Sequence, residues 1–444
     1  MVLRGKKVLV IGLARTGSEC ARFLAGHGAK VMVSDLRSEE GLKPAMEALA
    51  GLPIVYRLGG ADKGWLTGVD YVIPSPGVAK ENLLLRQALA LDIPVLSEIE
   101  LASRFFHAPL IAITGTNGKS TTTTLVGEIM KASGQRIFLG GNLGAPFIGA
   151  VSNDWDWGVV EISSFQLEWV KTFRPRIAAL LNISEDHLDR YATFADYCRA
   201  KERIFEAQAA EDFAVLNRDD PRVWEIRERI KSRVVSFGFS GVRDGVFAAA
   251  NEIVWRSGAE EERFSLRDVK LQGVHNMENM MAATAVAKCA GMSHTVIQKT
   301  LENFSGLEHR LEFVRERDGV RYYNDSKGTN VGAVVKSLAS FDGPVILLAG
   351  GVDKGGDYAP LEEGVKQKVR RLVLFGAAKQ IIARSLGQLT DSVIVEDMPA
   401  AVRDAAAHAR AGDVVLLSPA CSSFDQFANY AERGKVFKRL VQEL

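Results

Sequence analysis

The stretch AITGTNGKSTTTTLV (112–126) combines the residue types that bind phosphate. A short apolar run enters a turn containing Gly115 and Gly118, and Lys119 and Ser120 begin a helical segment. Backbone N–H groups of such a turn and a helix N-terminus attract phosphate oxygens, a lysine neutralises their charge, and a hydroxyl can join a Mg²⁺ shell. The turn is shorter than the GxxxxGK[ST] loop of kinases and GTPases. We predict a shortened ATP-phosphate loop, with a structural glycine turn as the alternative.

Two ionisable side chains follow later apolar runs. Glu161 ends the run GVVEIS, where a carboxylate is costly unless it meets a cation or a hydrogen-bond donor. His187 lies in the acidic loop NISEDHLDRY (182–191), directly after another apolar run. Both positions predict contact with Mg²⁺ or phosphate, because ligands of open parallel sheets bind at the carboxyl ends of strands. A satisfied structural carboxylate and a structural histidine are the alternatives.

Predicted helices contribute three further candidates. Thr193 and Asp196 form a T-x-x-D capping pattern that begins a helix, and on periodicity alone Lys201 in that helix is an exposed lysine. Asn276 and Asn279 are three residues apart in a second predicted helix and therefore share a face. Two amides on one face can hold an adenine edge, or they can cap the helix.

The first strand is followed by GLARTG (12–17), and Asp35 ends the second strand. This pattern partly matches the dinucleotide fingerprint, in which glycines let the backbone approach a pyrophosphate and an acid binds a ribose hydroxyl. Ala14 replaces the middle glycine, which disfavours NAD. A structural turn is one remaining interpretation, and a different nucleotide-bearing ligand is the one we favour. The groups available to a diphosphate or a pyrimidine are Arg15, Thr16, Arg37 and the turn SPG (75–77).

The last third of the chain offers groups suited to ribose hydroxyls and a carboxylate. They are His309 and Arg310 in HRLEFV, Asp325, Ser326, Lys327 and Thr329 in YYNDSKGTN, Lys354 in GGVDKGGD, and Ser422 and Ser423 in SPACSSFDQF. Cys421 in the last segment is predicted to be a packed thiol, since the sequence places no base beside it; a nucleophilic cysteine is the alternative.

Short runs rich in Val, Ile and Leu alternate with amphipathic segments along the chain, which predicts an α/β fold with parallel sheets buried on both faces. The expected strands are 7–12, 30–35, 110–114, 158–163, 176–184, 344–351, 371–376 and 414–419. New strand–turn–helix units predict three domains, at residues 1–107, 108–306 and 307–444. Residues 237–270 predict exposed β-hairpins, because they alternate weakly and carry many charges.

The composition excludes several classes of protein. The 444 residues include 55 Lys+Arg and 54 Asp+Glu, a formal net charge of +1, and 47% are hydrophobic. This balance is typical of globular proteins and provides no overall field for nucleic acid or an anionic membrane. The four cysteines form no CxxC pair, and no apolar stretch reaches the roughly 18 residues of a membrane span. We expect reduced thiols, no nucleic-acid partner, no membrane insertion and a cytoplasmic location.

The combined motifs resemble those of the Mur ligases, across all three sections of the chain. They are GTNGKST, EISSFQLE, NISEDHLDRY, RAKERIF, GVHNMENMMAA, HRLE, NDSKGTN and SPACSSFDQFANYAERG. NDSKGTNVGA and SPACSSFDQF resemble the D-glutamate-adding branch of the family. The resemblance implies a Rossmann-like UDP-binding domain, a central P-loop-type ATP-binding domain with a parallel sheet, and a Rossmann-like amino-acid-binding domain.

The same resemblance implies an activity. It is the ATP-dependent ligation of D-glutamate to UDP-N-acetylmuramoyl-L-alanine (UDP-MurNAc-L-Ala) through an acyl phosphate, in peptidoglycan precursor synthesis, by a monomer. A family member with a different amino acid is the nearest alternative. An NAD-dependent oxidoreductase would leave GTNGKST unexplained, and a P-loop switch or assembly ATPase would leave the carboxylate-binding groups of the last section unexplained.

The resemblance also implies a role for each matching residue. Lys119, Glu161, His187 and Lys201 would be catalytic, and two Mg²⁺ ions would be held by Ser120, Glu161, His187 and Lys201 as a carbamate. ATP would be bound by Gly115, Thr116, Asn117, Gly118, Lys119, Ser120, Thr121, Asn276, Asn279, Arg310 and Asp325. The UDP-linked substrate would be bound by Arg15, Thr16, Leu36, Arg37, Ser75, Gly77, Asn142, Ser163 and His187. D-Glutamate would be bound by Lys327, Thr329, Lys354, Ser423 and Tyr430. The family has Leu where Phe424 stands and Phe where Tyr430 stands.

Overall fold

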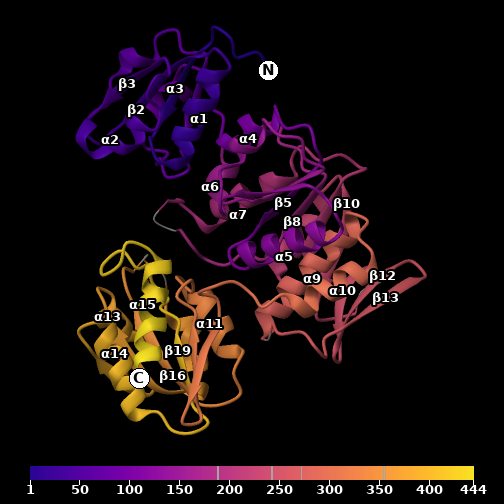
Figure 1. The fold of residues 1–444 in the computed structure, drawn as a ribbon, viewed down its shortest axis with the longest axis vertical. Coiled ribbons are helices and arrows are strands. Elements are labelled where there is room, and N and C mark those ends of the chain that lie inside the picture. The colour runs from indigo at the N-terminus through magenta and orange to yellow at the C-terminus, as the bar shows by residue number, and fades with distance from the viewer. Residues whose placement is uncertain (188–189, 242–243, 272, 354, 356) are drawn as a thin grey trace.

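The computed structural model describes all residues of the chain except 188–189, 242–243, 272, 354 and 356. The described residues form three β-sheets, one in each successive part of the sequence, with helices packed around each sheet (Figure 1). Every expected strand is present, although several are shorter than predicted. The prediction of an α/β fold is confirmed.

The first sheet is parallel and has the strand order β3-β2-β1-β4. Ile11 of β1 pairs with Ser34 of β2 and Pro74 of β4, so the carboxyl ends of these strands are level. The loops that begin at Gly12 and Asp35 therefore meet at one edge. The elements are β1 (Lys7–Ile11), α1 (Arg15–Gly26), β2 (Lys30–Asp35), α2 (Glu39–Glu47), β3 (Ile54–Leu58), β4 (Tyr71–Pro74), α3 (Leu83–Ala90) and α4 (Glu98–Ser103).

The middle sheet has the order β13-β12-β11-β10-β9-β8-β5-β7-β6, and its central strands are parallel. In chain order, its first elements are β5 (Leu110–Thr114), α5 (Lys119–Ala132), β6 (Ile137–Gly141), β7 (Trp157–Glu161), α6 (Ser164–Leu167), β8 (Ile177–Leu180), α7 (Phe194–Glu202) and β9 (Phe213–Asn217). The remainder are α8 (Pro221–Glu225), β10 (Arg233–Gly238), β11 (Gly245–Ala249), β12 (Glu252–Ser257), β13 (Glu260–Ser265), α9 (Val274–Cys289) and α10 (His294–Asn303). Strand β5 is buried along its whole length, which explains its purely apolar start.

The prediction of hairpins in residues 237–270 is confirmed, but their expected exposure is wrong in part. Strands β11, β12 and β13 pair antiparallel and extend the middle sheet. Val246, Ile253 and Phe264 on one face are buried in the same apolar cluster as α9 and α10. Glu252, Arg256, Glu261 and Arg263 occupy the other face, so a weak alternation was enough to make one side of each strand part of the core.

The third sheet has the order β14-β15-β19-β16-β17-β18, with only β14 antiparallel among its described strands. Strands β15, β19 and β16 are neighbours whose carboxyl ends are level, since Leu417 of β19 pairs with both Asn324 and Leu348. The elements are β14 (Glu312–Arg317), β15 (Val320–Asn324), α11 (Val331–Ala339), β16 (Val345–Gly350), α12 (Glu362–Lys368), β17 (Val369–Phe375), α13 (Lys379–Leu386), β18 (Asp391–Ile394), α14 (Met398–His408), β19 (Val414–Leu417) and α15 (Tyr430–Glu443).

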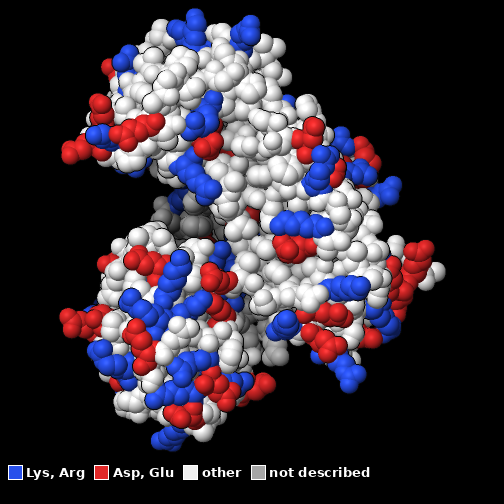
Figure 2. Space-filling model, in the orientation of Figure 1, with Lys and Arg blue, Asp and Glu red and all other residues white. Residues whose placement is uncertain are grey.

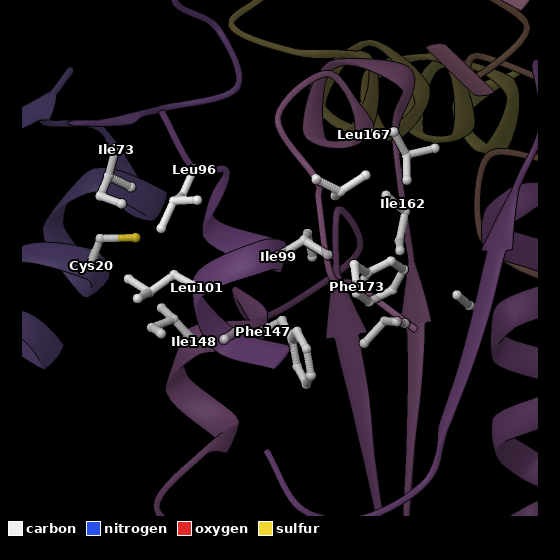
Figure 3. Packing of buried hydrophobic residues seen from close by; sticks show 14 of the residues in the cluster. Cys20, Ile73, Leu96, Ile99, Leu101, Phe147, Ile148, Ile162, Leu167 and Phe173 are labelled. Carbon is white, nitrogen blue, oxygen red and sulfur yellow. The ribbon is translucent and has the colours of Figure 1, made fainter. Parts of the chain in front are cut away.

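A continuous apolar cluster joins the first sheet to the middle sheet. Figure 3 shows its buried side chains running from Cys20 and Ile73, through Ile99 on α4, to Ile162 and Phe173 beside the middle sheet. Apolar contact removed from water stabilises such a junction without directional bonds. The first sheet is therefore held against the middle sheet at α4.

The surface carries charges of both signs. Figure 2 shows Lys and Arg interspersed with Asp and Glu on this face, and a deep notch between the N-terminal part and the C-terminal part.

No helix in the described part of the chain combines the length and the apolar character needed to cross a bilayer.

Candidate functional site

The turn between β5 and α5 has the geometry of a phosphate-binding loop. Gly118 adopts φ +84°, and a Cβ on it would lie 2.2 Å from Oδ1 of Asn279, so a larger residue would displace that side chain. Lys119 Nζ donates hydrogen bonds to the backbone oxygens of Gly115 and Thr116, both at 2.8 Å. Its ammonium group is thereby held at the turn, within reach of phosphate oxygens. Ser120 and Thr121 are buried in the first turn of α5.

Residues from distant parts of the middle section support this turn. The Asn117 N–H donates to Oδ1 of Asn182 at 2.8 Å, and Nδ2 of Asn182 donates to the Asn117 oxygen at 3.1 Å. The Thr116 hydroxyl lies 3.1 Å from the Tyr197 hydroxyl and donates to the Ser184 oxygen at 3.2 Å. The phosphate loop, the loop after β8 and helix α7 therefore form one connected unit.

Glu161 lies level with Ile113 of β5, beside the phosphate loop. Its side chain is 2% exposed; Oε1 accepts a hydrogen bond from Asn142 Nδ2 at 2.6 Å, and Oε2 is buried with no hydrogen-bond partner. Burial opposes ionisation, but the ammonium of Lys119, the bond from Asn142 and the charge of Lys327 bring the pKa of Glu161 below its usual value. An ionised, buried oxygen without a partner fits a bound cation.

The donor atoms around Glu161 suit Mg²⁺ bound together with nucleotide phosphates. The Ser120 hydroxyl, at the start of α5, lies beside this carboxylate and accepts a hydrogen bond from Lys327 Nζ at 2.9 Å. Within the described ranges, no three His, Cys, Asp or Glu side chains gather as a metal site of their own. A carboxylate and a hydroxyl that leave the other positions to phosphate and water are the typical protein ligands of Mg²⁺.

The expectation that Lys201 is an exposed helix lysine is wrong. Its side chain is 1% exposed, and Nζ donates to the Gly115 oxygen at 2.8 Å and lies 4.6 Å from the centre of the Tyr197 ring. Helix α7 turns the face carrying Tyr197, Ala200 and Lys201 inward, which the pattern of a short charged helix does not reveal. Burial, followed by repulsion from Lys119, lowers the pKa of Lys201 well below its usual value. The site thus favours an uncharged, nucleophilic amine.

His187 lies at a second cleft, between the middle and the C-terminal sheets. Its backbone adopts φ +56°, which is strained for a residue other than glycine, and its side chain is 34% exposed with the ring centre 4.7 Å from that of Phe165. The cleft has a volume of about 230 Å³ and is lined by Ser184, Glu185, Asp186, His187, Thr329, Asn330, Val331, Gly332, Asp353, Asp357, Tyr358, Pro360 and Ala420.

A small cavity of about 30 Å³ lies beside Asn117 and Gly118 of the phosphate loop. Asn117, Gly118, Asn279, Arg310, Asp325 and Lys327, all implied in ATP or amino-acid binding, are among its lining residues. Nε of Arg310 is buried without a hydrogen-bond partner. Burial lowers the pKa of Arg310 despite the attraction of Glu161 and Asp325. A guanidinium with an unused donor suits an anionic ligand.

The two asparagines of α9 and Asp325 have distinct surroundings. Asn276 and Asn279 are both buried, but only Asn279 is among the described lining residues of the small cavity, and its Oδ1 accepts a bond from the Thr122 hydroxyl at 3.2 Å. Asp325 accepts bonds from the Ser337 and Ser418 hydroxyls, each at 2.7 Å. Burial raises the pKa of Asp325 to about 6.

The largest of the described clefts, about 710 Å³, lies between the loops of the first sheet and the β6 region of the middle sheet. It is lined by Ile11, Gly12, Ala14, Arg15, Thr16, Ser34, Asp35, Leu36, Arg37, Ala61, Ser75, Pro76, Gly77, Val78, Ala79, Asn82, Leu84, Gly141, Asn142, Gly144, Pro146 and Gln166. Seven of the nine residues implied in UDP-substrate binding are among them. Ser163 instead caps α6 through a reciprocal pair of hydrogen bonds with Gln166, and His187 lies at the second cleft.

The hydrogen bonds of Asp35 argue against the NAD interpretation. Oδ2 of Asp35 accepts from the Leu13 N–H at 2.8 Å, and Oδ1 accepts from the backbone and guanidinium nitrogens of Arg37 at 3.0 and 3.1 Å. Burial opposes ionisation, but these bonds lower the pKa of Asp35 to about 2. The carboxylate thus shapes the loop and orients Arg37, and its oxygens are already engaged where a dinucleotide would need them for ribose.

The residues implied in D-glutamate binding occupy more than one place. Thr329 lines the second cleft, whereas Lys327 reaches Ser120 across the domain boundary, and its Nζ lies 5.1 Å from the centre of the Tyr430 ring. Ser423 is 2% exposed. Lys354 lies outside the described residues. Burial lowers the pKa of Lys327 to about 7. Cys421 is buried, as predicted for a packed thiol, with Sγ 3.2 Å from the Tyr358 hydroxyl.

Several polar residues of the second cleft were not predicted from the sequence. Asn330 caps α11 through its Oδ1, and its Nδ2 donates to Asp186 at 3.1 Å. The Tyr358 hydroxyl donates to Asp353 at 2.9 Å. The asparagine directly before VGAVVKSLA is a recognisable capping signal, but nothing local indicates the contact with Asp186.

Comparisons with known proteins agree in all three parts of the chain. Residues 6–97 match a family model described as Mur ligase MurD-like, N-terminal domain; residues 113–287 match Mur ligase middle domain; and residues 309–421 match Mur ligase, glutamate ligase domain. The chain is 51% identical to a protein of Geotalea daltonii named UDP-N-acetylmuramoylalanine–D-glutamate ligase, over all of this chain and 99% of that protein. A protein of the same name from Geobacter metallireducens is also 51% identical, over 100% and 99% of the two chains.

Solved structures show the same fold at much lower identity. MurF ligase from Thermotoga maritima, solved in complex with ADP, superimposes with a TM-score of 0.61 and 16% identity over 100% of this chain and 99% of that one. A pseudomurein peptide ligase type C from Methanothermus fervidus gives a TM-score of 0.60 and 20% identity over 99% and 100%. On the family models and the full-length relatives together, this chain belongs to the Mur ligase family.

Proposed function

We propose that this protein joins D-glutamate to UDP-MurNAc-L-Ala in an ATP-dependent reaction that passes through an acyl phosphate and yields ADP and phosphate. The names of relatives that are about half identical over the whole chain support the choice of substrates. The product would serve peptidoglycan precursor synthesis.

One observation carries this proposal. Glu161 lies where groups from the three parts of the chain come together: its Oε1 accepts a bond from Asn142, which lines the largest cleft, and its Oε2 lies beside the phosphate loop. From the C-terminal part, Lys327 reaches Ser120 next to the same carboxylate. A carboxylate substrate in the cleft, a triphosphate on the loop and an amino acid from the third part can therefore converge at one point.

The first step transfers the γ-phosphoryl group to the carboxylate of the UDP-linked substrate. Hydroxide is a poor leaving group, so an acid and an amine do not condense until the acid carries phosphate. Lys119, the N–H groups of the phosphate loop and Arg310 can spread the charge of the transferring group. When bound, Mg²⁺ supplies further positive charge to the phosphate oxygens. Ser120 and Glu161 are the residues that we propose to hold it, with His187 and modified Lys201 for a second ion.

The second step is attack by the amine of D-glutamate on the acyl phosphate, which forms the amide and releases phosphate. The second cleft, between His187 and Thr329, is the proposed route of this amine, because Ser184 in its wall is hydrogen-bonded to Thr116 of the phosphate loop. Contacts such as those of Asn330 with Asp186 and Lys327 with Ser120 would keep the C-terminal part closed and exclude water from the acyl phosphate.

We also propose that Lys201 is carbamylated. Its buried amine has a strongly lowered pKa, which favours attack on CO₂; the N–C bond forms and one proton is released. The resulting carboxylate would lie beside Gly115 and could hold a metal ion. ¹³C NMR of protein equilibrated with ¹³C-bicarbonate tests this directly: we expect a carbamate signal that is absent from Lys201→Ala. Activity of Lys201→Ala should be lost and not restored by bicarbonate, whereas short carboxylates should restore part of it.

Phosphate release measured with each substrate omitted in turn tests the overall proposal. We expect release to require both UDP-MurNAc-L-Ala and D-glutamate. Equal release without them would mean an ATPase of another kind, and the ligase proposal would be wrong. A panel of amino acids offered with UDP-MurNAc-L-Ala then tests the branch, since preference for any other amino acid would place the protein elsewhere in the family.

We further propose domain boundaries near residues 107 and 306, and a monomer that works in the cytoplasm. All implied ligand-binding groups come from one chain, which supports the monomer. The described cysteines are all free thiols, as is typical of a reducing compartment. Sedimentation of the purified protein with and without substrates measures the oligomeric state.

A further inference from the structure

Arg433 is the largest fully buried side chain of the protein. It enters from the first turn of α15 and is 0% exposed. Its Nε donates to the Ser326 hydroxyl at 3.0 Å, and Nη2 donates to the backbone oxygens of Ser326 and Cys421 at 2.8 and 3.1 Å. Nη1 donates to the Ser422 oxygen at 3.3 Å and the Gly350 oxygen at 3.5 Å. One guanidinium therefore contacts three separate loops.

These three loops follow neighbouring strands of the C-terminal sheet. Ser326 follows β15, Gly350 ends β16, and Cys421 and Ser422 follow β19. The loops are also tied to one another: the Ala420 N–H donates to the Gly328 oxygen at 2.9 Å, and Val352 and Ser422 exchange backbone bonds at 2.9 and 3.0 Å. Each loop carries a residue implied in amino-acid binding, namely Thr329, Lys354 or Ser423.

The acceptors of Arg433 are all neutral oxygens, which is unusual for a buried guanidinium. Burial lowers the pKa of Arg433 to about 10, and the acids Asp425 and Asp325 act on it only through space. Its charge is therefore not cancelled by a direct ion pair. Arg371 provides the contrast, because it is 8% exposed but bonds directly to Asp404 and Asp391.

We propose that Arg433 is a positioning residue for the amino-acid substrate, which holds the loops after β15, β16 and β19 in register. This inference rests on the proposed function and adds to it the residue that organises the amino-acid site. A lysine could not replace it, since one ammonium on a flexible stem reaches one loop, whereas the planar fork reaches all three.

The test compares Arg433→Lys with Arg371→Lys in the full-length protein. With the other two substrates saturating, the KM for D-glutamate should rise about tenfold or more in Arg433→Lys, while the KM for ATP stays within about twofold. Hydrogen exchange should quicken at the Val352, Ala420 and Ser422 amides and stay unchanged in α14. Arg371→Lys should lower the melting temperature and leave the ratio of the two KM values unchanged.

An unchanged KM for D-glutamate, or an equal rise in the KM of all three substrates, would overturn the positioning role. Wild-type protein that makes no amide from D-glutamate would instead overturn the proposed function, and the exchange rates of the loop amides would still decide whether Arg433 holds them. If Arg433→Lys does not fold, Ser326→Ala decides in its place. It removes one acceptor of Arg433, and the KM for D-glutamate should then rise about threefold; no rise would overturn the inference.

Discussion

The largest cleft and the phosphate site differ in how far their functional side chains are exposed to solvent. In the cleft, Leu36 is 67% exposed, and Arg37 has its charge matched by Asp35. At the phosphate site, Glu161 and Lys201 are 2% and 1% exposed, and Glu161 retains an oxygen without a partner. Solvated groups around an open cleft can recognise a ligand at little cost to the fold. Buried charged groups, one of them with an oxygen left without a hydrogen-bond partner, are expected where charge must be stabilised during a reaction.

Removing the charge of Glu161 should have the largest effect on turnover. Glu161→Gln keeps the shape and the acceptor for Asn142 but not the charge for a cation, so kcat should fall about 10³-fold or more. Stability to urea at neutral pH should fall, because the lowered pKa of Glu161 means that its ionised form stabilises the folded chain through Lys119 and Lys327. Phosphate release across a Mg²⁺ titration measures the first effect.

Glu100 is the matched control for this variant. It is also buried, but its carboxylate accepts bonds from the Lys171, Thr172 and Phe173 N–H groups and from Arg104. Glu100→Gln should lower stability and leave kcat within about twofold, because its role is to hold backbone. Similar kcat values for the two variants would contradict the distinction between matched and unmatched charges.

Replacing Lys119 of the phosphate loop should have the next largest effect on turnover. Lys119→Met removes one positive charge from the turn but not the backbone donors, so kcat should fall about 10²- to 10³-fold. Because its hydrogen bonds to the backbone oxygens of Gly115 and Thr116 are made within one turn, the melting temperature should change little. Kinetics at saturating ATP measure this, and wild-type turnover would rule out Lys119 as a phosphate ligand.

The stability of the junction between the first and middle sheets should depend on pH. Glu98 on α4 is fully buried, and burial raises its pKa from 4.5 to about 7. The unfolded chain releases this proton at lower pH than the folded chain, so Glu98 reduces stability progressively as the pH rises from 4.5 to about 7. Glu98→Gln should gain about 3 kcal/mol over wild type above that range and little below it. Urea unfolding at pH 4.5 and 8 measures the difference, and equal differences at both would contradict the shift.

A substitution in the largest cleft should have the smallest effect on the kinetics. Arg15→Ala removes one side chain from a large surface, so the KM for the UDP-linked substrate should rise about tenfold with kcat nearly unchanged. Initial rates at varied substrate concentration measure this. A fall in kcat comparable to that of Lys119→Met would show that the cleft also takes part in the chemical step.

Local patterns predicted much of this molecule. The apolar runs located the strands, and Gly115, Gly118 and Lys119 indicated the phosphate loop, because a turn and its first helical residues are neighbours in the chain. Lys201 was predicted wrongly on periodicity, because a short helix rich in charge does not reveal which face packs inward. Arg433 drew no prediction, since two of the three loops that it contacts, at Ser326 and Gly350, lie 107 and 83 positions from it in sequence.

The residue types by themselves determined that phosphate and carboxylate chemistry is available to this protein, because hydroxyls, lysines and glycines act over a few neighbouring positions. The tertiary structure alone decided which charges are matched and which are not. Asn142 meets Glu161 because β6 and β7 pair within the middle sheet, and Lys327 meets Ser120 because the C-terminal part packs against the middle part. Burial and partnership are properties of distant contacts, so the reactivity of Glu161 and Lys201 follows from the packed chain and not from their neighbours in sequence.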